Sequence, residues 1–340
     1  MRILMINHEF TITGSSTAFF RLALHLKSSG HEILLLAINP ADGPIRARYD
    51  AAAIPVIESA VLGDFDLAIG NTICAAPLVL RVGPHVPTIW FVNEAEVGLR
   101  LLLGNTEWID AFAAASAVIF NMAFQHDVFR SFTYPLDQRK FHTNPFGVDI
   151  DPTLIARQAV PAKQRALRVV QVGTIERRKR PGDFIQAVAR TGLDIECIIC
   201  GKFFELDDTA RRIVENEPEK YRLLEGLSDG EILAWVESAD VFCLASQSET
   251  QSLAAYEAAL LARPLVLSDL ACYRDVFVHG RNSLMFPPGH VDLLALSISM
   301  YFSNPRLRLE LGQAAQRTAR AYSNAAFFAR FEAILRSVVG

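Results

Sequence analysis

Two carboxylates mark the strongest candidate site in the sequence. Glu249 and Glu257 stand eight residues apart in a segment, Val241 to Ser268, that predicts strand, loop, helix, turn and strand. The helix is expected to begin near Ser252, where unpaired N–H groups and a partial positive charge suit a phosphate. Glu257 then lies about 7.5 Å along that helix, at ~1.5 Å per residue. The spacing fits a ligand with a sugar on each side of a diphosphate; the plain alternative for Glu257 is a solvated helix residue.

A second candidate is a run of cations after a predicted strand. Residues 172–181 read Val-Gly-Thr-Ile-Glu-Arg-Arg-Lys-Arg-Pro, with Arg178 and Lys179 near the end of the turn. Positive side chains at this point would neutralise a leaving diphosphate. The alternative interpretation is a solvated basic turn.

A third candidate is the loop Thr11–Thr17, whose small residues permit close approach of a phosphate or sugar. We expect it to precede a helix at Ala18–Lys27. The loop matches neither Gly-x-Gly-x-x-Gly nor a Walker sequence, which argues against a dinucleotide dehydrogenase and a P-loop NTPase.

The elements that position these residues alternate between strand and helix along the whole chain. Residues 151–163 contain two prolines and have weak periodicity, and a new strand–loop–helix unit begins at Arg168, as one does at Arg2. This alternation predicts an α/β fold of two Rossmann-like parallel-sheet lobes facing a cleft, at residues 1–155 and 156–322, with ligands at the carboxyl ends of the strands. The expected strands are Arg2–Asn7, Glu32–Ala37, Leu67–Gly70, Thr88–Val92, Ala117–Asn121, Arg168–Val172, Ile195–Cys200, Val241–Ala245 and Pro264–Ser268.

Composition excludes several classes of protein. Of 340 residues, 51% are hydrophobic and 21% charged, enough for two buried cores and too apolar for a disordered chain. Lys and Arg total 33 against 37 Asp and Glu, and the net charge of −4 argues against a nucleic-acid partner. No apolar run reaches the ~18 residues of a membrane span, and the N-terminal apolar stretch is too short for an export signal. We expect the protein to work in the cytoplasm.

Several of these segments together resemble a known family. They are the loop at Thr11–Thr17, Asn144–Asp149, Gly173–Lys179, and Glu249 with Glu257. In this combination the chain resembles the GT-B-fold glycosyltransferases of group 1, family 4, which are retaining enzymes with nucleotide-sugar donors. The resemblance implies GT-B architecture, with the donor on residues 156–322 and the acceptor on residues 1–155. In such folds the last helix, here 323–340, packs back on the first lobe.

The resemblance also implies roles for individual residues. Lys179, with Arg178 beside it, would hold the donor diphosphate, and Glu249 would contact the hydroxyls of the transferred sugar; these three are the expected catalytic residues. Glu257 would meet the ribose. The further donor-binding candidates are Gly14, Ser15, Gly173, Thr250, Gln251, Ser252 and Leu253, and the candidates on the acceptor or sugar side are His8, Asn93 and Glu94. For His8, a structural role is the alternative.

Three departures from the family pattern affect these expectations. Thr174 stands where a second phosphate-binding arginine is common, so Arg177 or Arg178 would have to replace it. Thr250-Gln-Ser-Leu253 replaces the common Gly-Phe-Gly-Leu, and Asn93 stands where many members have a histidine.

We expect no cofactor and no metal, because the cations and the helix start would neutralise the diphosphate of a UDP- or GDP-linked donor. Asp64-Phe-Asp66 and Asp149-Ile-Asp151 match Asp-x-Asp, the metal-binding element of a different glycosyltransferase fold, and are the alternative. Cys197 and Cys200 lie in one predicted strand and point to opposite faces, so they are not expected to share a metal. The rival functions are a sugar-phosphate synthase or phosphorylase of similar fold, and a two-lobed sugar-binding protein without catalysis.

The acceptor is expected to be a glycan or a lipid-linked sugar. Apolar residues of the first lobe, Phe19-Phe20, Trp90-Phe91 and Leu99–Leu103, have two interpretations. They are core residues, or they form a peripheral contact with the cytoplasmic face of the membrane. Ser323–Val339 predicts an amphipathic C-terminal helix with Phe327, Phe328, Phe331, Ile334 and Leu335 on one side.

Overall fold

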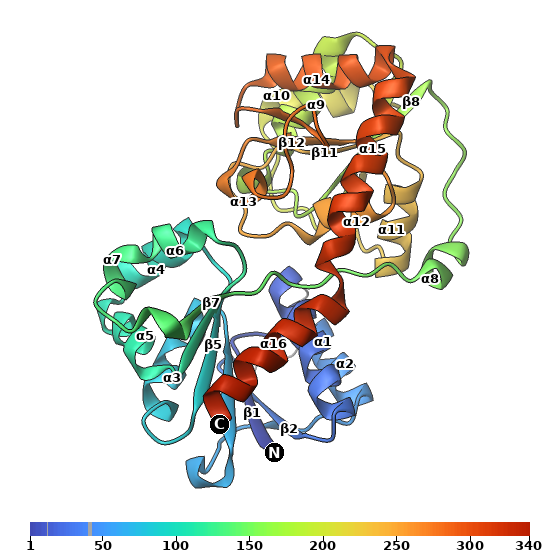
Figure 1. Cartoon of the computed structure of the whole chain (residues 1–340). Coiled ribbons are helices and arrows are strands. Elements are labelled where there is room, and N and C mark those ends of the chain that lie inside the picture. The colour runs from blue at the N-terminus through green and yellow to red at the C-terminus, as the bar shows by residue number, and fades with distance from the viewer. Residues whose placement is uncertain (12, 40–42) are drawn as a thin grey trace. The chain divides into compact units, whose positions relative to one another are not determined.

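The structure is a computed structural model that describes residues 1–11, 13–39 and 43–340. Its contacts divide the chain into two units. Unit 1 consists of Met1–Gly147 and Asn324–Gly340, and unit 2 of Val148–Ser323 (Figure 1). The division falls at 147/148 rather than at the expected 155/156, because Ile155 in the helix α8 (Pro152–Ala156) packs on Leu233 and Ala234 of unit 2.

Unit 1 is built on a parallel sheet of seven strands among the described residues, in the order β3-β2-β1-β4-β5-β6-β7. Its strands are β1 (Arg2–Asn7), β2 (Glu32–Ala37), β3 (Val56–Ile57), β4 (Leu67–Asn71), β5 (Thr88–Val92), β6 (Ala117–Phe120) and β7 (Phe141–Thr143). Its helices are α1 (Gly14–Ser28), α2 (Pro44–Ala51), α3 (Ala76–Val82), α4 (Glu96–Gly104), α5 (Ala111–Ala114), α6 (Phe124–Val128), α7 (Arg130–Thr133) and α16 (Asn324–Val339).

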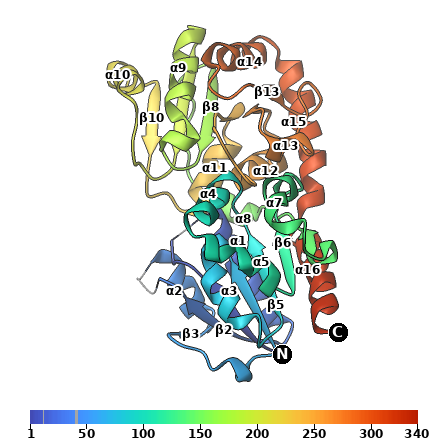
Figure 2. The same ribbon diagram turned by 90° about the vertical axis from the view of Figure 1, so that its left-hand side faces the viewer.

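Helices cover both faces of this sheet, so its strands are apolar on both sides, as expected for a parallel sheet (Figures 1 and 2). Alternate residues of β5 show the two cores. Trp90 packs on Phe112 of α5, while Phe91 packs on Phe19 of α1 and on Phe331 of α16. These aromatic residues are therefore core residues, and the surface interpretation of Phe19 and Trp90-Phe91 is wrong.

The C-terminal helix α16 belongs to unit 1 by its contacts. Phe327, Phe331, Ile334 and Leu335 are buried, in keeping with the apolar side expected from the sequence. Phe328 stacks on His25 of α1 at 4.0 Å between ring centroids, and His25 Nε2 lies 2.8 Å from Glu332 Oε1. At its start, α16 crosses so close to Gly147 that a Cβ on this glycine would lie 2.4 Å from Asn324 Cα.

Unit 2 has a parallel sheet of six strands in the order β10-β9-β8-β11-β12-β13. The strands are β8 (Leu167–Val172), β9 (Ile195–Cys200), β10 (Tyr221–Leu224), β11 (Val241–Leu244), β12 (Leu265–Ser268) and β13 (Leu284–Phe286). Besides α8, the helices are α9 (Pro181–Thr191), α10 (Asp208–Asn216), α11 (Asp229–Glu237), α12 (Leu253–Leu260), α13 (Ala271–Arg274), α14 (Val291–Ser303) and α15 (Pro305–Ala319).

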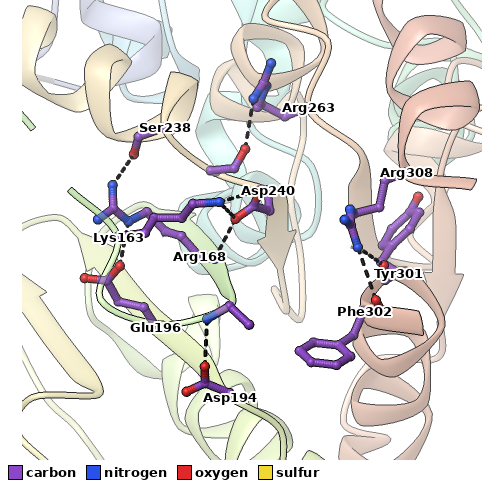
Figure 3. A network of polar contacts seen from close by, with 12 residues as sticks. Lys163, Arg168, Asp194, Glu196, Ser238, Asp240, Arg263, Tyr301, Phe302 and Arg308 are labelled. Atoms are coloured by element: carbon purple, nitrogen blue, oxygen red, sulfur yellow. Dashed lines mark hydrogen bonds and ion pairs between the residues drawn. The ribbon is translucent and has the colours of Figure 1, made fainter. Parts of the chain in front are cut away.

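A buried ion pair anchors the amino-terminal end of the second sheet (Figure 3). Arg168 on β8 donates from Nε to Glu196 of β9 at 2.8 Å, and their side chains are 2% and 3% exposed. Nη1 donates to Ser238 Oγ, Nη2 to the carbonyl of Pro161, and the guanidinium lies over the Trp235 ring. Because each guanidinium nitrogen has an acceptor and the two charges are paired, the ion pair is tolerated in the core.

The α/β prediction with two Rossmann-like lobes is confirmed, and so are the nine expected strands, to within one residue at each end. The first helix begins at Gly14 rather than Ala18, since Thr13 and Ser16 form a capping box that starts it earlier. The expected loop Thr11–Thr17 is therefore shorter, and its residue 12 lies outside the described residues.

Candidate active site

The two strongest sequence candidates meet in unit 2. The loop after β8 carries Lys179 and the loop after β11 carries Glu249, and β8 and β11 are neighbours in the sheet. Lys179 Nζ donates to Glu249 Oε1 at 2.5 Å, and Arg178 Nη1 lies 3.5 Å from Glu249 Oε2. The structure therefore brings together all three residues expected to be catalytic, at the carboxyl end of the sheet.

Backbone geometry explains how the first loop presents its cations. Gly173 has φ +148°, a conformation that favours glycine, and its N–H donates to the carbonyl of Cys200. A 3₁₀ turn at Arg177–Lys179 follows, and Arg180 adopts a left-handed φ of 49° before Pro181 starts α9. The N–H of Gln247 donates to the carbonyl of Arg178, which joins this turn to the Glu249 loop.

Glu249 is an ionised carboxylate in a nearly closed setting. Its side chain is 6% exposed, and Ser246 Oγ donates to Oε1 at 2.7 Å. Burial alone would raise the pKa of Glu249, but Lys179 and Arg178 outweigh it and hold the pKa below its ordinary value. The site therefore holds a fixed negative charge beside two cations at neutral pH.

The helix that follows, α12, begins as expected. Ser252 is its buried N-cap residue, and in the described structure its side chain makes no capping hydrogen bond to the helix. Thr250 and Gln251 lead into the helix, Leu253 is its first residue, and Glu257 lies in its second turn, partly exposed. The first-turn amides of α12 thus lack a side-chain cap from Ser252.

The candidates of unit 1 lie at the carboxyl ends of its own strands. His8 follows β1; its Nδ1 lies 3.1 Å from Thr72 Oγ1 and its Nε2 3.1 Å from Glu9. Thr72 has φ 72° and ψ 164°, a region nearly restricted to glycine, at a cost of about 1–3 kcal/mol. Backbone strain of this kind is common at binding sites. The contacts of His8 with Thr72 and Glu9 also fit a structural role for this histidine.

Asparagines end or follow five adjacent strands of unit 1, and three of them form a directed chain. They are Asn7, Asn71, Asn93, Asn121 and Asn144, all buried. Asn7 Nδ2 donates to the Glu9 carbonyl, which can only accept, so Asn7 Oδ1 must accept from Asn71 Nδ2. Asn71 Oδ1 in turn accepts from Asn93 Nδ2 at 2.6 Å, and Asn93 Oδ1 is left without a partner in the described part of the chain.

Glu94 follows Asn93 and accepts a hydrogen bond from the N–H of Ile73 at 2.9 Å. Burial raises the pKa of Glu94 to about 7, since the three backbone N–H groups that face it compensate only in part. It is thus a carboxyl group that changes its protonation near neutral pH. Gly14 and Ser15, the remaining candidates of unit 1, are the first two residues of α1.

Sequence reasoning missed several polar residues that hold these sites together. In unit 2 they are Ser246 and Glu176, and in unit 1 Thr72, Asn71 and Gln125, whose Nε2 donates to the carbonyls of Val92 and Glu94. The sequence did contain a pattern that points to Asn71, since asparagine recurs at the ends of the strands. Nothing in the spacing of Glu176 separates it from a solvated loop carboxylate.

Among the described residues, no group of three or more His, Cys, Asp or Glu side chains is placed to hold a metal ion. Asp66 accepts the N–H of Arg2, and Asp151 caps α8 by accepting from Thr153. Cys197 and Cys200 lie in β9 as expected, and burial raises the pKa of Cys200 to about 12. None of the helices in residues 1–11, 13–39 and 43–340 is both long and apolar enough to cross a membrane.

Most of unit 2 matches a known protein family. The profile of the family Glycosyl transferases group 1 matches residues 154–318, which include the loops after β8 and β11 and all of α12. Residues 154–318 belong to the glycosyl transferases group 1 family. The group 1 domain thus covers nearly the whole of unit 2 and contains Lys179, Glu249 and Glu257.

Curated relatives include two D-inositol 3-phosphate glycosyltransferases. That of Pseudarthrobacter chlorophenolicus is 24% identical over 195 residues, 54% of this chain and 46% of the relative. That of Paenarthrobacter aurescens is 24% identical over 213 residues, 56% of this chain and 50% of the relative. The chain spans about half the length of these curated relatives where it matches them.

Solved structures share the GT-B architecture over the whole chain. Alr3699/HepE of Anabaena, solved with UDP and glucose, is 18% identical to this chain and has a TM-score of 0.82. The match covers 99% of this chain and 100% of the HepE chain. The sucrose-phosphate synthase of Thermosynechococcus elongatus is 16% identical and has a TM-score of 0.75, and the match covers 99% of this chain and 98% of the synthase chain. The GT-B prediction is confirmed at the level of the fold.

Proposed function

We propose that this protein is a retaining glycosyltransferase that moves a sugar from a nucleoside-diphosphate sugar to an acceptor hydroxyl. The observation that carries the proposal is the contact of Lys179 and Arg178 with Glu249 in unit 2, near the start of α12. Such a donor needs two cations, an ionised carboxylate and helix amides, which here lack a cap from the Ser252 side chain. The group 1 domain and the bound UDP and glucose in the HepE structure support the same proposal.

In the proposed reaction, the bond between the anomeric carbon and the diphosphate breaks, and its electron pair leaves with the phosphate. Lys179 and Arg178 face the negative charge that develops on the phosphate and stabilise it. The N–H groups at the start of α12 stabilise the same charge. Glu249 contacts the sugar hydroxyls beside the positive anomeric carbon, and Glu257 holds the ribose. The acceptor oxygen forms its bond to the anomeric carbon on the face that the diphosphate leaves, and the leaving phosphate accepts the proton of that hydroxyl. Attack on this face retains the configuration.

The acceptor side is proposed to lie on unit 1, with His8, Asn93 and Glu94 as its contacts and a glycan or lipid-linked sugar as its acceptor. For a lipid-linked acceptor, we propose that α4 contacts the bilayer, because its apolar residues Val97 and Leu103 are 39% and 62% exposed. Vesicle co-sedimentation tests this: Leu103→Asp should release the protein from liposomes if α4 contacts the bilayer. Equal sedimentation of both proteins would rule α4 out.

The proposed activity is tested by incubating the protein with UDP- and GDP-linked sugars and measuring release of the nucleoside diphosphate. We expect release with at least one donor, loss of release in Glu249→Gln, and full activity in excess EDTA. Loss in EDTA that Mg²⁺ restores would overturn the metal-free proposal and favour the Asp64–Asp66 or Asp149–Asp151 pairs. Absence of release with every donor, despite binding, would favour a sugar-binding protein.

A further inference from the structure

Arg178 is held by acceptors on two loops of unit 2. Its Nη1 donates to the Ser248 carbonyl at 3.1 Å and lies 3.5 Å from Glu249, both on the loop after β11. Its Nη2 donates to Glu176 Oε1 at 2.9 Å, on the loop after β8. The guanidinium therefore ties the Glu249 loop to the loop that carries Lys179.

Glu176 is the anion that holds the outer side of this guanidinium. Its Oε1 accepts from Thr174 Oγ1 at 2.7 Å as well as from Arg178, so two donors fix one carboxylate oxygen. The backbone of Glu176 belongs to the same turn, because its carbonyl accepts the N–H of Lys179 at 3.0 Å. A change in the side chain would leave that backbone bond in place.

These contacts leave part of Arg178 available. A guanidinium has five N–H bonds, and the contacts with Ser248, Glu249 and Glu176 account for three of them. Among the described residues, no side chain or carbonyl accepts a hydrogen bond from Nε–H or from the second N–H of Nη2. The Arg178 side chain is 38% exposed, so a ligand can reach it.

We propose that Glu176 is a positioning residue that, together with Thr174, aims the remaining N–H groups of Arg178 at the diphosphate of the donor. The inference rests on the proposed function, because it takes a nucleoside diphosphate as the ligand of unit 2. Glu176 itself does not touch the ligand: it fixes the guanidinium plane, and an oriented guanidinium binds a phosphate through two parallel bonds.

Calorimetric titration of UDP, GDP, UMP and GMP into the full-length protein tests this. Glu176→Gln keeps the shape but removes the charge, and should weaken binding of the diphosphate that the wild type prefers by about three- to tenfold. Binding of the matching monophosphate should change by less than about twofold, since it engages fewer of the oriented donors. A general loosening of unit 2 would lower both affinities together.

Two further variants separate positioning from folding. Glu205→Gln is the matched control, because Glu205 accepts the backbone N–H of Arg177 in the same loop without holding the Arg178 side chain. It should leave both affinities at wild-type values. In an Arg178→Ala background, Glu176→Gln should add no further loss, because the group that it positions is gone.

The outcomes are distinct. Unchanged or increased diphosphate affinity in Glu176→Gln would overturn the inference, as would an equal loss for the monophosphate or additive losses in the double variant. If the wild type bound neither UDP nor GDP, the proposed function itself would fail. If it bound one of them and Lys179→Ala weakened it while Glu176→Gln did not, only the role of Glu176 would be wrong.

Discussion

Lys179 Nζ lies 2.5 Å from Glu249 Oε1, and the two side chains are only 13% and 6% exposed. They are seventy residues apart in the sequence and meet because β8 and β11 are adjacent in a parallel sheet. Both carboxyl ends therefore open at the same edge. Lys179 and Arg178 lower the pKa of Glu249, so the carboxylate is ionised where a donor is proposed to bind.

Lys179→Ala should lower turnover more than nucleotide affinity. The negative charge that this lysine faces grows as the sugar–phosphate bond breaks, and a preorganised group of this kind contributes about 10²–10³ in kcat. Steady-state kinetics beside calorimetry checks the split. Arg190→Ala, far along α9 and paired with Asp292, serves as the control for loss of a cation. Equal losses in kcat and in nucleoside-diphosphate affinity would contradict the role in catalysis.

Glu94 should make unit 1 less stable as the pH rises. Its pKa is raised from 4.5 to about 7 in the folded protein, so folding favours its protonated form. This contribution is complete below pH 4.5 and is lost between about pH 4.5 and 7, by roughly 3 kcal/mol. Relative to wild type, Glu94→Gln should therefore gain free energy of unfolding between pH 5 and pH 8 in urea titrations. The exposed Glu96→Gln should show no such gain. An identical pH profile for Glu94→Gln and wild type would count against a raised pKa of Glu94.

Arg168→Met should destabilise unit 2 by about 3–5 kcal/mol, because it removes the partner of the buried Glu196 (Figure 3). Among the described residues, the cation that then remains near Glu196 is Arg222, at 3.9 Å. Chemical denaturation measures the loss. The double variant Arg168→Met, Glu196→Leu should recover much of it, because no uncompensated charge then remains in the core. A double variant no more stable than the single one would show that the unpaired charge of Glu196 is not the source of the loss.

Gly147→Ala should destabilise the protein by about 1–3 kcal/mol, because its Cβ would lie 2.4 Å from the backbone of Asn324 at the start of α16. Gly104→Ala is the matched control, since a Cβ there meets nothing within 4 Å. Thermal unfolding of both variants checks the contrast. Equal melting temperatures would mean that the backbone of Asn324 leaves room for a Cβ at position 147.

The sequence predicted the interior of both sheets and failed at their edges. The nine predicted strands are the central ones, while the strands missed are β3, β7, β10 and β13, which lie at the four sheet edges among the described residues. Central parallel strands are buried on both faces and show continuous apolar runs. Edge strands such as Val56–Ile57 and Phe141–Thr143 are short and half-covered, so their pattern resembles that of a loop.

The candidate site shows the same limit. Lys179 and Glu249 were predictable because each follows a clear strand in a recognisable segment. Glu176 and Ser246 were not, because their role comes from hydrogen bonds across loops that spacing does not reveal. The asparagine chain of unit 1 likewise depends on which strands are neighbours, a property of topology rather than of any local pattern.

The most direct test compares nucleoside-diphosphate binding by Glu257→Gln and Glu249→Gln, using calorimetry with UDP and GDP. Glu257→Gln should weaken binding by roughly 10–150-fold, because a carboxylate that accepts ribose hydroxyl bonds contributes about 1.5–3 kcal/mol. Glu249→Gln should bind the nucleotide almost as wild type does and lose turnover instead, because free nucleoside diphosphate has no sugar at that carboxylate. Loss of nucleotide binding in Glu249→Gln with retention in Glu257→Gln would mean that the donor lies in the opposite direction. Wild-type binding and turnover in both variants would place the site elsewhere.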